Sequence, residues 1–243
     1  MSIAENLERV RREVDQACER AGRDPGSVRI MAVSKTHGPK LFAEAFRAGQ
    51  RLFGESRVQE WEHKREQLHS LLGEDVGEID MHLIGNLQNN KTSKAAWLYS
   101  AVDAVDTIKV AERLNAPCAQ AGKVLPVLIE VKLSEEASKH GVDPYAVSGL
   151  VRRIHEELEG LEVRGLMTVP PYSDDAEEAR PYFRHLCEIR DEAQQATGVA
   201  LPELSMGMTH DFAVAIAEGS TCVRIGTAIF GLREYATTPQ EEA

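Results

Sequence analysis

The chain has 243 residues, of which 28 are Lys or Arg and 39 are Asp or Glu, so its net charge is −11. Such an acidic chain lacks the basic surface with which proteins bind nucleic acid or anionic membranes, and we expect neither partner. The N-terminal segment 1–16 is charged and amphipathic, unlike a secretion signal, and no apolar run is long enough to span a bilayer. We therefore expect a cytoplasmic protein.

The four cysteines, Cys18, Cys118, Cys187 and Cys222, are far apart in the sequence and form no CxxC or CxxH pair. Metal sites usually show a short spacing between at least two of their ligands, so we expect no bound metal. Isolated, buried and reduced thiols are typical of a reducing compartment. The cysteines therefore also favour a cytoplasmic protein.

Helix-like and strand-like patterns alternate along the chain. An amphipathic helix is expected first, over residues 3–21. Short apolar runs then predict strands at 28–34, 51–54, 81–85, 101–105, 127–132, 162–169, 203–206 and 222–226. Amphipathic segments between them predict helices at 39–48, 58–72, 108–119, 144–159, 176–197 and 212–218. Several of the strands are apolar almost throughout, which is typical of parallel strands covered on both faces.

Eight such units in 243 residues predict an α/β protein with a closed (β/α)8 barrel, the TIM barrel, and an extra N-terminal helix. A doubly wound open sheet is the alternative, because the second and seventh predicted strands are short. No linker rich in Pro, Gly or Ser divides the chain, so we expect one domain over residues 1–243. The polar tail from about residue 234 is expected to fray.

Lys35 is the first candidate functional residue. It directly follows the first predicted strand, and in a TIM barrel the carboxyl ends of the strands form the active face. Burial of a lysine stem lowers the pKa of its amine, which then attacks carbonyl groups and forms a Schiff base. A solvated lysine at a strand end is the alternative interpretation.

The seventh and eighth predicted strands both end in turns rich in glycine and hydroxyl side chains. Gly226 and Thr227 follow the eighth strand, and the segment 205–211, SMGMTHD, ends the seventh. Many barrels bind phosphate here, because backbone N–H groups and a helix dipole face the anion. Ordinary turns are the alternative for either segment alone. Arg224, inside the eighth strand, must pair with a buried carboxylate or face a ligand, since its guanidinium stays charged.

Together, the lysine, the phosphate-binding turns and the arginine are the groups needed to hold pyridoxal 5′-phosphate (PLP). They supply a partner for the aldehyde, the phosphate and the ring nitrogen of that cofactor. The residues alone therefore predict a PLP-binding protein.

The chain also resembles a known family. In this order it contains AVSKT, FGESRVQE, HLIGNLQNNK, GLMTV, LSMGMT and VRIGTAIFG, which together are similar to the motifs of the pyridoxal phosphate homeostasis proteins. That family is a one-domain relative of the alanine racemase barrel, fold type III of the PLP proteins. The resemblance runs from about residue 32 to residue 233. It implies a protein that binds PLP and helps to balance the vitamin B6 and amino-acid pools of the cell.

The resemblance also assigns roles to single residues. It implies that Lys35 holds PLP as a Schiff base and that Arg224 lies against the pyridine nitrogen. The residues that it places at the phosphate are Ser205, Thr209, Gly226 and Thr227. Those that it places at the mouth of the barrel are His82, Gly85, Asn86 and Asn90, and it implies a contact between Ser56 and the PLP ring. Ser56 stands where the family usually has asparagine, so it offers one hydroxyl in place of an amide.

The same resemblance argues for little or no catalytic turnover. An arginine at the ring nitrogen keeps that nitrogen unprotonated, which makes the ring a weaker electron sink. Alanine racemase takes its second base, a tyrosine, from a C-terminal domain, and this chain ends soon after its last motif. We expect at most weak racemase-like activity. The alternatives are a PLP-dependent amino-acid racemase and a Schiff-base aldolase that acts on a sugar phosphate.

PLP is the one small-molecule partner that the residues identify. Enzymes that still lack their PLP are candidate recipients of the cofactor, and the sequence does not say which enzymes these are. The racemase dimer makes its main contact through its second domain, so the sequence favours a monomer.

Overall fold

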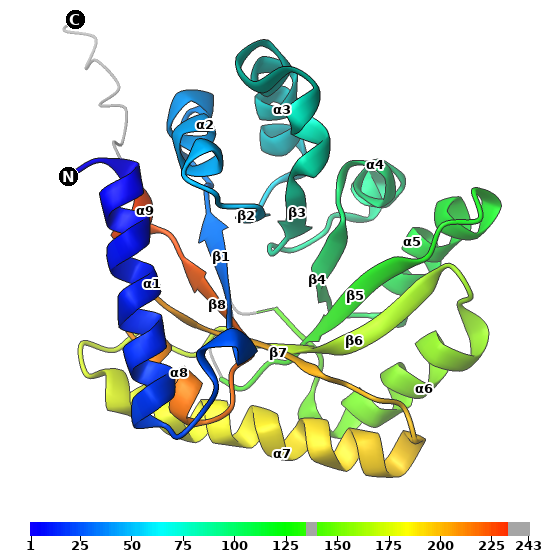
Figure 1. The fold of residues 1–243 in the computed structure, drawn as a ribbon. Coiled ribbons are helices and arrows are strands. Elements are labelled where there is room, and N and C mark those ends of the chain that lie inside the picture. Colours follow the sequence, from blue (N-terminus) through cyan, green and yellow to red (C-terminus); the bar gives the residue numbers. More distant parts are fainter. Residues whose placement is uncertain (135–139, 233–243) are drawn as a thin grey trace, which may run out of the picture.

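The computed structural model describes residues 1–134 and 140–232, and Figure 1 shows strands in the centre with helices around them. Eight parallel strands pair in chain order, and β8 pairs with β1, which closes the sheet into a barrel. The predicted (β/α)8 barrel is confirmed, and the alternative of an open doubly wound sheet is wrong. The expected fraying from residue 234 concerns a segment outside the described residues.

The strands agree with the predicted ranges to within two residues at each end. They are β1 (Arg29–Val33), β2 (Leu52–Glu55), β3 (Asp80–Leu83), β4 (Ala101–Val105), β5 (Leu125–Glu130), β6 (Leu161–Met167), β7 (Glu203–Met208) and β8 (Cys222–Ile225). All five residues of β4 are buried, as expected for a parallel strand covered on both faces.

The helices surround the barrel. Within the described residues they are α1 (Ile3–Arg20), α2 (Pro39–Arg47), α3 (Val58–Leu72), α4 (Thr92–Leu98), α5 (Ile108–Gln120), α6 (Val147–Glu157), α7 (Arg180–Thr197), α8 (Phe212–Ala217) and α9 (Thr227–Phe230). The sequence did not predict α4, because its apolar residues, 95–98, are consecutive and do not recur with a helical period. In the described part of the chain, no helix has the length and apolar character needed to cross a membrane.

The N-terminal helix α1 lies beside α8 and α9, at the left of Figure 1. A capping box closes its first turn, and its apolar stripe is buried. Asn6 donates its side-chain amide to Ile229 O at 2.9 Å, and Arg9 donates to Ala228 O at 2.9 Å. The helix that the sequence predicts as an addition to the barrel therefore holds α9, the helix that directly follows β8.

The main apolar core lies between the barrel and the helices, where buried side chains of strands and helices meet. Two small apolar clusters stand apart from it, one of Met31, Leu52 and Cys222 and one of Ala104, Leu128 and Met167. The strands of the barrel also carry buried charged side chains, including those of His82, Asp103 and Arg224. The barrel interior is therefore partly polar, which is expected where strands lead into a functional site.

Candidate functional site

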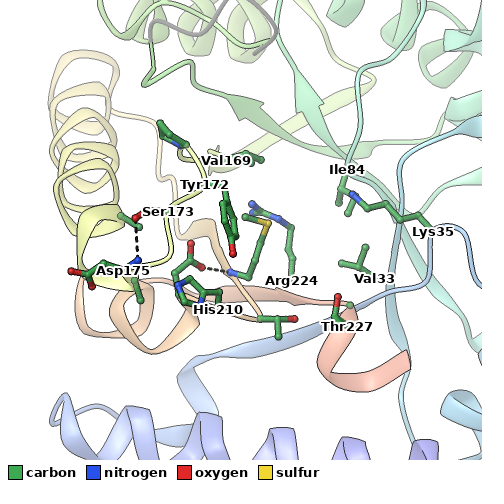
Figure 2. Close-up of a pocket in the computed structure, with 17 residues that line it drawn as sticks. Val33, Lys35, Ile84, Val169, Tyr172, Ser173, Asp175, His210, Arg224 and Thr227 are labelled. Carbon is green, nitrogen blue, oxygen red and sulfur yellow. Dashed lines mark hydrogen bonds between the residues drawn. The ribbon is translucent and has the colours of Figure 1, made fainter. Parts of the chain in front are cut away.

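A cavity of about 500 Å³ opens at the carboxyl ends of the strands. Its walls come from segments that end or follow β1, β3, β6, β7 and β8, as Figure 2 shows in part. Five residues singled out from the sequence border it together: Lys35, Thr209, Arg224, Gly226 and Thr227. They come from opposite ends of the chain, and they meet because β8 pairs with β1.

Lys35 is half-buried and lies two residues beyond β1. The Ser34 N–H donates to Gly54 O at 3.1 Å, so pairing with β2 continues up to the residue before Lys35. Thr36, the residue after it, has a φ of 70°, a left-handed conformation that strains a β-branched residue. In Figure 2 the Lys35 side chain extends along the cavity wall toward Ile84. The residues on both sides of Lys35 therefore have a constrained backbone conformation. The Lys35 side chain reaches into the cavity from this segment.

A turn with the features of an anion-binding site follows β8. Gly226 is the N-cap of α9, and Thr227 is its first residue. Within the described part of the chain no side chain caps this terminus, and the first N–H groups of a helix have no acceptor inside it. The hydroxyls of Thr227 and, after β7, Thr209 border the same cavity. Backbone N–H groups and two hydroxyls together suit a phosphate group.

Gly226 also lies close to β1. A Cβ at this position would be 3.4 Å from Val33 O and 3.7 Å from the Val33 Cβ. The turn at Gly226 is therefore close to the strand that leads to Lys35. A ligand with an aldehyde and a phosphate has a partner for each group in one cavity.

Arg224 is almost fully buried, yet it borders the cavity. Its guanidinium donates to Ser205 O at 2.6 Å, to Ser205 Oγ at 2.9 Å and to Thr168 O at 2.8 Å. These bonds use three of the five N–H groups that a guanidinium carries. Burial lowers the pKa of Arg224, but a guanidinium remains protonated in proteins. Among the described residues, the partners of the Arg224 guanidinium are Ser205 and Thr168 and not a carboxylate, and Arg224 borders the cavity.

Asp211, the last residue of the segment 205–211 singled out from the sequence, also borders the cavity, although the sequence assigned it no role of its own. Its Oδ1 accepts the Met208 N–H at 2.6 Å, which fixes the turn between β7 and α8. Burial raises the pKa of Asp211, and hydrogen bonding and the charge of Arg224 act in the opposite direction. The available signal was an acidic side chain directly before a short helix, a position that favours turn-forming residues.

Sequence reasoning missed Tyr172. It lies in the loop after β6, is 79% exposed, and borders the cavity together with Val169. Its ring lies 6.1 Å from that of His210, and Figure 2 shows both on the other side of Arg224 from Lys35. A loop sequence of small and polar residues gives no sign of which side chain turns toward a cavity.

The structure places the remaining predicted residues elsewhere. Ser205 is fully buried and contacts Arg224. Ser56, Gly85 and Asn86 border a second, neighbouring cavity of about 930 Å³, formed by the segments after β2 and β3. Asn90 is exposed and is not among the residues that border either cavity.

His82 lies inside the barrel and not at its mouth. Its Nδ1 is 3.0 Å from Asp103 Oδ1, and its Nε2 is 3.3 Å from Asp80 Oδ1. Burial by itself lowers the pKa of His82, but the two carboxylates outweigh it and raise the pKa to about 10. His82 is therefore an imidazolium at neutral pH, and its contacts are those of a buried ion pair.

Comparisons with known proteins agree with this geometry. Residues 5–234 match the family model described as "Alanine racemase, N-terminal domain". A pyridoxal phosphate homeostasis protein of Aquifex aeolicus is 42% identical over 235 residues, which cover 97% of this chain and 100% of the relative. The chain belongs to the pyridoxal phosphate homeostasis protein family. The resemblance seen in the sequence motifs is thereby confirmed.

Other members of the family show the same relationship. The homeostasis protein of Haemophilus influenzae is 38% identical, and the match covers 98% of this chain and 99% of that one. The structure of PipY from Synechococcus elongatus PCC7942 with PLP bound is 35% identical, with a TM-score of 0.82. That match covers 95% of this chain and 100% of PipY. PipY therefore has this barrel fold over 95% of the chain.

The residues around the cavity fit the cofactor that gives this family its name. The donor set consists of an amine, a helix terminus with two hydroxyls, and a buried guanidinium with two N–H groups left over. An aldehyde, a phosphate and a pyridine nitrogen are the groups that these donors complement. Within residues 1–134 and 140–232, no three His, Cys, Asp or Glu side chains are grouped so as to hold a metal ion.

Proposed function

We propose that this protein binds PLP and serves PLP homeostasis, with Lys35 as the residue that holds the cofactor. The observation that carries the proposal is the single cavity bordered by Lys35, Arg224, Gly226 and Thr227. An amine and an aldehyde join through a C=N bond and release one water, which makes the attachment reversible. The turn at Gly226 and Thr227 would hold the phosphate by N–H and hydroxyl donors.

Arg224 supports a role in holding the cofactor without turning it over. An arginine beside the pyridine nitrogen can donate a hydrogen bond to it but keeps its proton, because the guanidinium stays charged, so the nitrogen remains unprotonated. The ring then withdraws electrons less strongly, and the loss of a proton from a bound amino acid is slow. The bonds from Arg224 to Ser205 and Thr168 keep the guanidinium in place. We therefore propose at most weak racemase-like activity.

The proposal also covers the location, oligomeric state and partners of the protein. We place it in the cytoplasm as a monomer, with enzymes that lack their PLP as recipients of the cofactor. The thiols support this location, because three of the four are buried and burial raises the pKa of Cys222 to about 12. Unreactive thiols of this kind are typical of proteins in a reducing compartment.

Substitution of Lys35 tests the proposal. The wild-type protein incubated with PLP is expected to show a visible absorbance band and, after borohydride reduction, a stable adduct on the peptide that contains Lys35. Lys35→Ala should lose both signals and keep its far-ultraviolet circular dichroism, because Lys35 lies at the mouth and not in the packed core. Lys91→Ala is the control, since Lys91 borders the second cavity.

Three results would contradict the proposal. The same reducible adduct in Lys35→Ala would identify another lysine as the attachment point. Rapid racemisation of L-alanine by the PLP-loaded protein would make it a PLP-dependent enzyme. A sugar phosphate trapped on Lys35 in place of PLP would favour a Schiff-base aldolase.

A further inference from the structure

A buried polar cluster lies behind Lys35 and does not belong to the cavity described above. It consists of Ser34, Glu55, Glu60 and Lys64, which we call the anchor cluster. Ser34 and Glu55 are fully buried, and Lys64 is 5% exposed. These three are not among the residues that border either cavity, whereas Glu60 borders the second one. The cluster contains two carboxylates and one ammonium, and a PLP site has no direct need of any of them.

The cluster holds the backbone on the N-terminal side of Lys35. The Ser34 hydroxyl donates to Glu55 Oε1 at 2.8 Å. Lys64 Nζ donates to Ser34 O at 2.9 Å and to Glu55 Oε1 at 2.5 Å. Both the side chain and the carbonyl of Ser34 are therefore bound to charged groups of β2 and α3. Hydrogen bonds to charged groups are stronger than those between neutral groups.

The cluster also holds the backbone on the C-terminal side of Lys35. The Thr36 N–H donates to Glu60 Oε1 at 2.5 Å, and Lys64 Nζ lies 3.4 Å from the same oxygen. Thr36 is the one residue other than glycine with a positive φ in the described part of the chain. A strained conformation of this kind persists only where surrounding contacts hold it. Glu60, which lies on α3, supplies such a contact to Thr36.

Stability is a poor explanation for this cluster. Burying an ammonium and a carboxylate costs several kcal/mol for each ion, on the order of what their attraction returns. Within the described residues, the second oxygen of Glu55, Oε2, is buried without a hydrogen-bond partner. Burial accordingly raises the pKa of Glu55, although Lys64 opposes the shift. A pair of apolar side chains would be buried here at a lower cost in free energy. The presence of the charged groups is therefore better explained by a role other than stability.

We infer that Glu55, Glu60 and Lys64 are positioning residues, which hold the backbone on both sides of Lys35 so that its amine meets the PLP aldehyde. This inference rests on the proposed function, because it concerns the same lysine. The cluster acts through Ser34 and Thr36 and leaves the phosphate-binding turn untouched. Its loss should therefore impair formation of the C=N bond and spare recognition of the phosphate.

Two ligands separate positioning from simple stability. PLP carries an aldehyde and a phosphate, whereas pyridoxine 5′-phosphate has an alcohol in place of the aldehyde and forms no C=N bond. The double variant Glu55→Gln/Lys64→Met removes both buried charges together. We expect it to slow formation of the visible band by about tenfold or more, and to change the dissociation constant for pyridoxine 5′-phosphate by less than about twofold.

A second variant keeps the test valid if the double variant fails to fold. Glu60→Ala removes the acceptor of the Thr36 N–H at a less buried position and should also slow capture of PLP. Glu60→Gln retains an amide oxygen there and should restore much of the rate. Glu62→Gln/Lys94→Met is the matched control, because it removes an exposed ion pair of 2.7 Å that also involves α3.

The outcomes divide clearly. Slower PLP capture with unchanged binding of pyridoxine 5′-phosphate supports the inference. An equal loss for both ligands, or no change for either, overturns it and makes the cluster a structural feature of β1, β2 and α3. If the wild-type protein itself forms no borohydride-stable adduct at Lys35, the proposed function fails, and this result is distinct from the others.

Discussion

The chemistry of the site depends on residues whose neighbours are far away in the sequence. Arg224 is held by Ser205 on β7 and by Thr168 just beyond β6, so three successive barrel segments fix one guanidinium. Thr227 begins a helix whose last carbonyls are bound by α1. The side chains at the site are therefore held in position by contacts that exist only in the closed barrel.

The Thr227 hydroxyl is expected to bind the phosphate of PLP. Thr227→Val removes this hydroxyl and keeps the shape of the side chain. The loss of one hydrogen bond to a charged group costs about 1.5–3 kcal/mol, and each 1.4 kcal/mol is about tenfold in the dissociation constant. A titration with PLP measures this change, and Thr227→Ser should restore affinity. Equal losses for PLP and for pyridoxal, which has no phosphate, would contradict the assignment.

The buried pair of His82 and Asp103 predicts a pH-dependent stability. The pKa of His82 in the folded protein, about 10, lies above its ordinary value of 6.5. The folded state therefore binds a proton more tightly than the unfolded state does. The stabilisation by the charged pair is complete below pH 6.5 and disappears as the pH rises through 10.

The difference in unfolding free energy between the wild type and His82→Gln measures this effect. It should be largest at or below pH 6.5 and fall steadily toward pH 10. His185→Gln, which removes an exposed histidine 3.3 Å from Glu188, is the control and should show little dependence on pH. A difference for His82 that stays constant up to pH 10 would exclude the charged pair.

At the scale of elements, the loops at the mouth are held by close contacts. The loops after β2 and β3 meet at Gly85, where a Cβ would lie 2.5 Å from Ser56 O and 2.8 Å from the Ser56 Cα. These are backbone atoms, so a side chain at this position must push the two loops apart. The second cavity lies between the same loops. Position 85 therefore requires glycine, because any larger residue would clash with the backbone of Ser56.

Gly85→Ala is expected to destabilise the protein by about 1–3 kcal/mol, the usual cost of overpacking. Urea denaturation measures the change. Gly149→Ala is the matched control: Gly149 lies in α6, and a Cβ there meets nothing within 4 Å. That substitution should stabilise the helix by about 0.5–1 kcal/mol. Equal effects of the two substitutions would show that the loops do not touch at Gly85.

At the scale of the whole molecule, the pairing of β8 with β1 brings the site together. Ala32 lies opposite Ile225 in the register of these strands, so the residues that follow both strands emerge side by side. Lys35 and Gly226 thereby border one cavity, although they lie near opposite ends of the sequence. A ligand bound to both would connect the first and the last unit of the barrel.

PLP is therefore expected to stabilise the whole barrel. A ligand at one hundred times its dissociation constant adds about 2.7 kcal/mol to the unfolding free energy. For a domain of this size, each kcal/mol raises the melting temperature by about 2–4 °C, so a shift of about 5–11 °C is expected. Differential scanning calorimetry measures it. Lys35→Ala should show a smaller shift, and no shift in the wild type would contradict PLP binding at this cavity.

The sequence by itself determined the class of fold and predicted the candidate binding residues that border the first cavity. Apolar periods and turn residues are local properties, so the strands were predicted to within two residues. Lys35, Arg224 and the Gly226–Thr227 turn were recognisable because each has a side chain or backbone unusual for its position at a strand. The helix α4 escaped prediction because its apolar residues, 95–98, are consecutive and show no helical period.

Only the tertiary structure decided which residues share a cavity and which are buried together. His82, expected at the mouth from its motif, pairs with Asp103 on the neighbouring strand inside the barrel. Glu55 and Lys64 had no signal in the sequence, because their meeting with Ser34 depends on how α3 packs against β1 and β2. Ion pairs and cavities arise between segments that are distant in the chain, so strand register and barrel closure determine them and local composition does not.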